Sequence, residues 1–192
     1  MTGKLLIAGV GNIFLGDDGF GVEVAGRLAA TELPDWVRVA DYGIRGMHLA
    51  YDLAGGYSSA ILVDATARGG APGTIYLIEP DVTAADGEAA AGEDATLDPG
   101  PLFNAHGMQP DVVLGLLGML DERERQVLVV GCEPASLDYG IGLSEPVAAA
   151  VDEAVKVVLD LVAGAARSGD HQLTTNEWAT TKESPYVPWH SR

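Results

Sequence analysis

Residues 9–21, "GVGNIFLGDDGFG", form the turn between an apolar run and the first helical segment of this 192-residue chain. Gly9 and Gly11 have the G-x-G spacing of a dinucleotide-binding loop, which a third glycine three positions further on would complete. Phe14 occupies that place. The stretch therefore predicts a strand, a tight turn and a helix, but not a complete nucleotide-binding fingerprint.

Two adjacent acids, Asp17 and Asp18, follow where the helix is expected to start. Carboxylates are favourable at a helix N-terminus, but they would repel a phosphate bound there. The turn is therefore suited to a cation rather than to a nucleotide. Either acid could instead be a simple helix cap.

Composition restricts the class of protein further. The length favours one domain, and a net charge of -17 with a pI near 4.3 argues against binding to nucleic acid or to an anionic membrane. A cation or a cationic partner segment fits better. A single cysteine, Cys132, excludes an intramolecular disulfide, and no stretch resembles a membrane span or a signal peptide, so we expect a cytoplasmic protein.

Short β-branched runs alternate with amphipathic segments along the chain, which is typical of α/β proteins with parallel strands. The patterns predict strands at about 4–9, 37–41, 59–64, 73–79 and 126–131, and helices at 18–32, 46–54, 109–120 and 145–163.

The third and fourth predicted strands are joined by only about eight residues, several of them Gly or Pro. A parallel return needs a crossover of a dozen or more residues, so we expect the fourth strand to run antiparallel in a mixed sheet.

Two segments lack the pattern of a packed element. Residues 82–101 are small, acidic and without period, which predicts a mobile loop. From about residue 165 the chain is rich in Ser, Thr and Gly. We therefore predict one α/β domain over 1–164 and a loose tail over 165–192, unless a partner or the tail's own tryptophans hold it.

Further polar residues fall where ligands bind in open α/β sheets, beyond the carboxyl ends of the strands. Asp41 ends the second strand, Asp64 ends the third in "AILVDAT", and His106 precedes a predicted helix in "FNAHGMQPD". Asp41 could instead cap a turn, and His106 could be a helix-entry residue. An acid that ends a buried strand, such as Asp64, must be paired, solvated or functional.

Aspartate oxygens with an imidazole nitrogen suit a divalent metal, and the sequence has no thiolate-rich zinc pattern. Other candidates are weaker. Cys132 is best explained as a small buried side chain, there is no G-x-S-x-G elbow, and Glu133 is expected in a turn after the fifth strand.

Five blocks of the sequence resemble one family in order and spacing. They are "GVGNIFLGDDGFGVEVAGRL", "DYGIRGMHLAYDL", "AILVDATARGGAPGTIYLIE", "HGMQPDVVLGLL" and "VVGCEPASLDYGIGLSEPV". Over roughly residues 4–162 the chain resembles the nickel-iron hydrogenase maturation endopeptidases.

This resemblance implies a three-layer α/β/α fold with a five-stranded sheet in the order 2-1-3-5-4, strand 4 being antiparallel at the edge. It also implies that two acids and a histidine bind nickel already placed in the precursor large subunit of a hydrogenase, whose C-terminal extension is then removed. By motif, the nickel ligands are Asp18, Asp64 and His106, and Asp41 has an accessory catalytic role near the scissile bond. Many relatives carry Glu at the position of Asp18, which leaves Asp17 as the alternative ligand.

The leading hypothesis is therefore an endopeptidase whose nickel is supplied by the substrate. The free protein is expected to hold no tightly bound cofactor. A bound divalent metal can polarise a carbonyl and lower the pKa of a coordinated water, and Asp41 could position or deprotonate that water. A nickel-sensing chaperone that binds the precursor without cutting it is the alternative. A nucleotide-binding module is disfavoured by Phe14 and the acidic pair.

Overall fold

The computed structural model describes residues 3–80, 125–168, 171–174 and 186–188, and four helical positions at 113, 115, 117 and 120. Its strands are β1 (Leu5–Val10), β2 (Val37–Gly43), β3 (Ser59–Ala65), β4 (Ile75–Glu79), β5 (Gln126–Cys132) and β6 (Tyr186–Pro188). The helices are η1, a 3-10 turn (Gly16–Gly19), α1 (Phe20–Ala29), α2 (Gly46–Ala54) and α5 (Glu145–Ser168).

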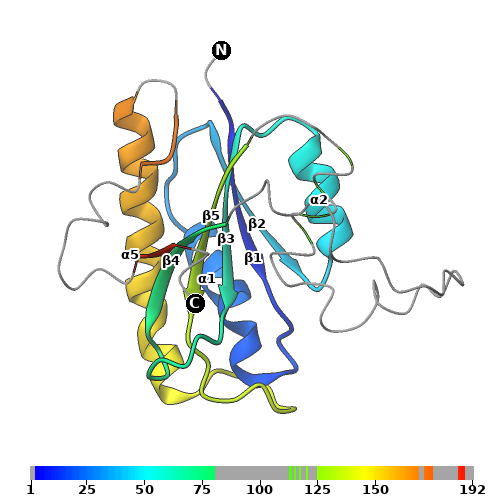
Figure 1. Ribbon diagram of the computed structural model, residues 1–192, viewed down its shortest axis with the longest axis vertical. Helices are drawn as coiled ribbons and strands as arrows, with labels where there is room; N and C mark the ends of the chain where they lie inside the picture. Colours follow the sequence, from blue (N-terminus) through cyan, green and yellow to red (C-terminus); the bar gives the residue numbers. More distant parts are fainter. Residues whose placement is uncertain are drawn as a thin grey trace, which may run out of the picture.

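The five predicted strands form one sheet in the order β2-β1-β3-β5-β4, and the prediction of a mixed sheet is confirmed. β1 pairs in parallel with both β2 and β3, and β3 pairs in parallel with β5. β4 runs antiparallel to β5, because the connection from β3 is too short for a crossover. Figure 1 shows the sheet between α2 on one face and α1 and α5 on the other.

The part of the chain predicted to be a loose tail contains structure of its own. α5 continues to Ser168, past the predicted domain end, and Leu173 is buried and exchanges two backbone hydrogen bonds with the Gln126 side chain, at 2.6 and 2.8 Å. The ring of His171 stacks on that of Trp36 with centroids 4.0 Å apart.

A sixth short strand, β6, pairs in parallel with β4 along Leu77–Glu79, so β4 is not the outermost strand over those residues. Sequence patterns missed β6 because three residues are too few to show a period. The rest of the tail and the predicted mobile loop at 82–101 lie outside the described residues.

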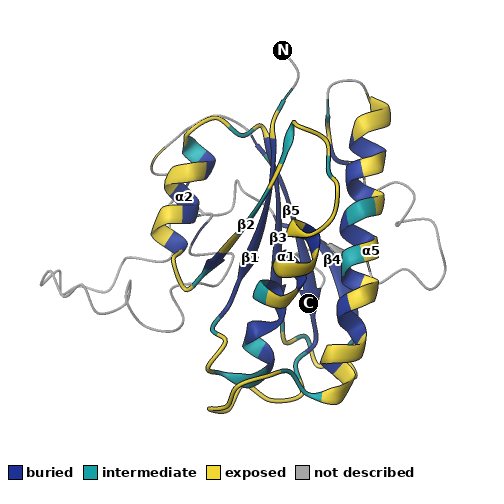
Figure 2. Ribbon diagram, turned by 180° about the vertical axis from the view of Figure 1, so that it is seen from behind, coloured by how far each residue is buried: buried dark blue, intermediate teal, exposed yellow. Residues whose placement is uncertain are grey.

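The sheet separates two apolar layers, and alternate strand residues point to opposite sides. Figure 2 shows the buried strands behind the exposed outer faces of α1 and α5. The layer beneath these two helices includes Leu5, Ile7, Ile61, Val63 and Leu128. The layer on the α2 side includes Leu6, Ala8 and Leu62, together with the helical positions Val113 and Leu117.

The glycines of the opening stretch bring α1 close to the sheet. A Cβ on Gly21 would lie 2.0 Å from the carbonyl oxygen of Val63, and one on Gly9 would lie 2.3 Å from that of Gly21. Only glycine fits such an approach. The helix begins at Phe20 rather than at the predicted residue 18, since the two acids belong to η1.

Candidate functional site

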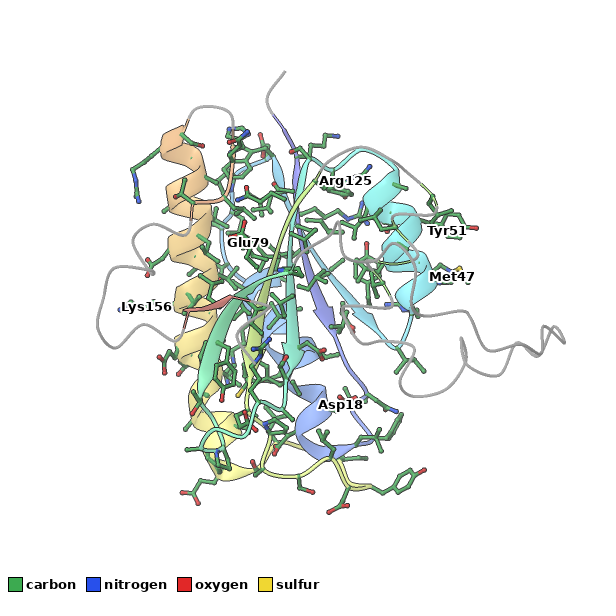
Figure 3. The ribbon with its side chains drawn as sticks, in the orientation of Figure 1. Asp18, Met47, Tyr51, Glu79, Arg125 and Lys156 are labelled. Atoms are coloured by element: carbon green, nitrogen blue, oxygen red, sulfur yellow. The ribbon has the colours of Figure 1, made fainter. Side chains whose placement is uncertain are left out.

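The carboxyl ends of β1, β2, β3 and β5 meet at one edge of the sheet, and acids from all four connections lie there. The register pairs Gly9 of β1 with Asp41 on one side and with Val63 on the other, one residue before Asp64. Figure 3 shows Asp18 at the end of the sheet toward which β1 and β3 point, while Arg125 lies at the opposite end. The predicted acids therefore lie at one edge of the sheet.

Asp17 is the buried member of the acidic pair and is fully occupied by hydrogen bonds. Its Oδ2 accepts from the backbone N–H of Ala135 at 2.8 Å and of Ser136 at 3.1 Å, and from the Ser144 hydroxyl at 2.9 Å. Its Oδ1 accepts from the Ser144 N–H at 2.6 Å.

These contacts also set the charge state of Asp17. Burial acts to raise the pKa of the Asp17 carboxyl, but the hydrogen bonds from Ser144, Ser136 and Ala135 outweigh it and hold the pKa below its ordinary value of 3.8. The side chain is 1% exposed. Asp17 therefore fastens the loop after β5 to η1 and has little capacity left to bind a metal.

Asp18 is half-buried and, within the part of the chain that the structure describes, accepts one hydrogen bond, from the backbone N–H of Asn12 to Oδ2 at 2.6 Å. Burial raises the pKa of the Asp18 carboxyl above its ordinary value, and the Asn12 hydrogen bond only partly opposes this. A nearby cation would stabilise this partly desolvated carboxylate. Of the two neighbouring acids, Asp18 is the one with open coordination capacity.

Asp41 and Asp18 lie on the two sides of a pair of hydrogen-bonded glycines. The N–H of Gly11 donates to the carbonyl of Gly43 at 3.1 Å, and both glycines have positive φ, at 121° and 50°. A Cβ on Gly11 would lie 3.7 Å from the Asp18 Cγ, and one on Gly43 would lie 3.5 Å from the Asp41 Oδ1. The two acids therefore flank the same glycine contact.

Asp41 is exposed and lies in β2, two residues before the strand ends. Its backbone carbonyl accepts a hydrogen bond from the Arg45 guanidinium, which also donates through Nε to the Tyr42 carbonyl at 3.0 Å. The Arg45 side chain thus closes the turn between β2 and α2. It keeps the Asp41 backbone fixed while the carboxylate faces solvent.

Asp64 is buried near the end of β3. Side chains alternate along a strand, so Asp64 lies on the same face of β3 as Ala60 and Leu62, which point into the α2-side layer. The described helical positions that follow His106 in sequence, Val113 and Leu117, pack into the same layer. The helix after His106 therefore covers the face toward which Asp64 points.

His106 itself lies outside the described residues. Within the described part of the chain, no three His, Cys, Asp or Glu side chains come close enough together to hold a metal ion. Asp17, Asp18, Asp41 and Asp64 share an edge of the sheet, but a metal site there needs a donor from elsewhere, and an imidazole would suit nickel or another divalent ion.

Glu133 is a fifth acid at this edge, where the sequence predicted it in a turn after the fifth strand and assigned it no role. Its carboxylate is buried and accepts from the N–H groups of Arg68 and Gly69, at 2.8 and 3.1 Å, and from the Tyr76 hydroxyl at 2.8 Å. It thereby fixes the loop that leaves Asp64. The signal that could have found it is the one applied to Asp64, an acid directly after a buried apolar strand.

Cys132 is fully buried in the layer beneath α1 and α5. Burial, with a smaller contribution from the negative charges of Asp17 and Glu133, raises the pKa of the Cys132 thiol to about 12. A protonated, inaccessible thiol is a poor nucleophile.

The fold and this edge define the class of protein, a doubly wound α/β protein with acidic side chains at the carboxyl ends of its strands. Comparison with known proteins identifies the family. The hydrogenase maturation protease family matches residues 22–161. The chain therefore belongs to the hydrogenase maturation protease family and is a hydrolase acting on peptides.

Individual relatives agree with this assignment. The chain is 33% identical over 158 residues to the hydrogenase 2 maturation protease of Escherichia coli, covering 81% of this chain and 88% of that protein. It is 31% identical over 174 residues to the hydrogenase expression/formation protein HoxM of Azotobacter vinelandii, covering 87% and 78%. The solved structure of the E. coli hydrogenase maturating endopeptidase HybD superposes with a TM-score of 0.64 at 27% identity, covering 86% of this chain and 94% of the other.

No helix in the described ranges combines the length and the apolar composition that crossing a membrane would require.

Proposed function

We propose that this chain is the endopeptidase that removes the C-terminal extension of a nickel-loaded large-subunit precursor of a nickel-iron hydrogenase, in the cytoplasm. The observation that carries the proposal is the placement of Asp18 and Asp41 on either side of the Gly11–Gly43 contact, at the edge where Asp64 lies near the end of β3, in a member of the hydrogenase maturation protease family.

The nickel arrives as part of the substrate. Asp18 and Asp64, with His106, would supply two carboxylate oxygens and one imidazole nitrogen, a donor set that suits nickel. Asp18 fits this role because, among the described residues, a single N–H donates to its half-buried carboxylate, whereas four donors occupy the Asp17 carboxylate. Nickel bound there could polarise the scissile carbonyl.

Asp41 would act on the water. It lies on the strand beside β1, so its Cα is about two strand spacings, roughly 10 Å, from that of Val63. By strand parity the Asp41 side chain leaves β2 on the α1 side and the Asp64 side chain leaves β3 on the α2 side, so a substrate would reach both beyond the strand ends. Asp41 takes a proton from the water while the oxygen of that water bonds to the carbonyl carbon of the scissile peptide. The proton then passes to the peptide nitrogen, which leaves as the C–N bond breaks.

The direct test is to incubate the purified chain with nickel-loaded and nickel-free precursor and to measure the product masses. We expect one cut near the C-terminus of the nickel-loaded precursor and none in the nickel-free one. Binding of the loaded precursor without any product would favour the non-cleaving chaperone. Equal cleavage of both precursors would remove nickel from recognition.

A further inference from the structure

A surface pocket of about 360 Å³ lies between the η1–α1 segment and the loop that leads into α5. Six apolar side chains line most of it: Ile13, Val22, Ile141, Leu143, Ala148 and Val151. We infer that this pocket docks an apolar side chain of the precursor large subunit, flanked there by Lys or Arg. This inference rests on the proposed function and adds where and how the partner binds.

The pocket is connected to the candidate site through η1. Gly16 and Gly19, the two ends of η1, line the pocket, and Asp18 lies between them in sequence. Ile13 lines the pocket and follows Asn12, whose N–H binds the Asp18 carboxylate. A partner side chain seated in the pocket would therefore place neighbouring chain close to Asp18.

The two loops that frame the pocket are fixed to each other. The N–H of Gly16 donates to the Gly140 carbonyl at 3.0 Å, and the N–H of Gly140 donates to the Phe14 carbonyl at 2.9 Å. The buried Asp17 carboxylate binds the same β5–α5 loop at both ends, through Ala135 and Ser144. A pocket with fixed walls costs little ordering on binding, which favours its use as a docking site.

Large apolar side chains stand exposed on these same two loops. Ile141 is 82% exposed and Ile13 46% exposed at the pocket, and Phe14, Leu137 and Tyr139 are exposed on the same two segments. An exposed apolar cluster around a pocket is typical of a protein interaction site. Isolated exposed apolar residues would need no such explanation, but these five lie on two segments joined by hydrogen bonds.

The charge around the pocket favours basic residues next to the docked side chain in the partner's sequence. Arg27 lines the pocket with Glu23, and its guanidinium is already bound to Glu23 at 3.3 Å and to Asp152. Two acids and one cation leave this rim negative, on a chain with a net charge of -17. Lys or Arg beside the docked apolar side chain would complement it.

Two adjacent alanines on α5 provide a matched pair of variants. Ala148 and Ala149 are both exposed, but only Ala148 lines the pocket. Ala148→Trp would fill the pocket, whereas Ala149→Trp adds the same bulk beside it. Both are to be made in the full chain, with Tm measured to confirm folding, and Ile141→Ser removes one wall without adding bulk.

The measurements are the Kd of each variant for nickel-loaded precursor, in an Asp18→Asn background that is expected not to cut, and kcat and KM in the wild-type background. We expect Ala148→Trp to weaken binding and raise KM at least about tenfold, as loss of a binding hot spot does, with kcat unchanged. Ile141→Ser should weaken binding in the same direction, and Ala149→Trp should match wild type. Wild-type affinity should fall as salt is raised.

If Ala148→Trp and Ala149→Trp bind the precursor with equal Kd, the pocket is not the docking site and the inference is overturned. Cleavage by wild type would still support the proposed function in that case. Absence of precursor binding by wild type would overturn the inference as well. A wild-type dimer that Ala148→Trp dissociates, with precursor binding unchanged, would make the pocket a contact between copies and reject the precursor as its occupant. Binding that depends on Ala148 but never leads to a cut would uphold the docking site and defeat the peptidase function.

Discussion

Ser144 donates two hydrogen bonds to Asp17, one from its N–H at 2.6 Å and one from its hydroxyl at 2.9 Å. The two residues are 127 positions apart in sequence, so this contact ties the turn after β1 to the start of α5. It separates the roles of the acidic pair. Asp17 holds two loops together, and Asp18 is left with its carboxylate available at the edge of the sheet.

We expect Asp17→Asn to lower stability. An amide cannot accept from all the donors that surround this carboxylate, and hydrogen bonds to a charged acceptor contribute more than neutral ones, so the loss should be roughly 3 kcal/mol of unfolding free energy. Chemical denaturation checks it. Ser144→Ala, which removes only the hydroxyl donor, should cost less, and an Asp17→Asn protein as stable as wild type would contradict the anchoring role.

Asp18→Asn should have the opposite profile. Burial already raises the pKa of this carboxyl, so replacing the charge with a neutral amide should leave Tm unchanged or slightly higher. Cleavage of nickel-loaded precursor should fall by more than about a hundredfold, the upper range for changes that only surround a metal ligand. A greater loss of cleavage per folded molecule in Asp17→Asn would transfer the ligand role to Asp17.

Glu133→Gln should show a pH-dependent loss of stability. Burial acts to raise the pKa of Glu133, but hydrogen bonds from Arg68, Tyr76 and the glycine amides outweigh it and hold the pKa below its ordinary value of 4.5. A depressed pKa contributes stability above that value, which is lost as the pH falls through the lower pKa of the folded state.

The difference in unfolding free energy between wild type and Glu133→Gln should therefore be about 1–3 kcal/mol at neutral pH and should shrink below pH 4.5. Tyr76→Phe, which removes one donor to this carboxylate, provides the milder comparison. A difference that does not change with pH would mean that the charge of Glu133 contributes nothing.

Cys132→Ala should keep cleavage within about twofold of wild type, because a thiol with a pKa near 12 is protonated at neutral pH. The fully buried side chain leaves a small cavity, so stability should fall by about 1 kcal/mol. Cleavage is measured by product mass and stability by chemical denaturation, on the same preparation of the variant. Loss of cleavage beyond about tenfold in folded protein would return the thiol to the mechanism.

His106→Ala and Asp64→Asn should each abolish cleavage of nickel-loaded precursor in a chain that still folds, because each removes a proposed donor to the nickel that the substrate brings. Circular dichroism checks that each variant folds, and product mass checks that cleavage is lost. Full cleavage by either variant would remove that residue from the site.

Sequence alone determined the strands, their alternation with helices and the antiparallel sense of β4, because side-chain period and connection length are local properties. It also placed Asp18, Asp41 and Asp64 at strand ends, since parallel strands put their carboxyl ends at one edge. Resemblance to a family, rather than pattern, provided the strand order, which the structure confirms. The ligand roles of Asp18, Asp64 and His106 remain predictions.

The tertiary structure decided what each acid does. Asp17 and Asp18 are neighbours of the same type, and no local pattern distinguishes them; the donors that occupy Asp17 come from residues 135–144, brought there by the parallel pairing of β5. Glu133 became an anchor only through the loop after β3, and the docking pocket exists only because two loops distant in sequence are joined by backbone hydrogen bonds. These roles depend on contacts between distant segments, which folding creates and a local pattern cannot encode.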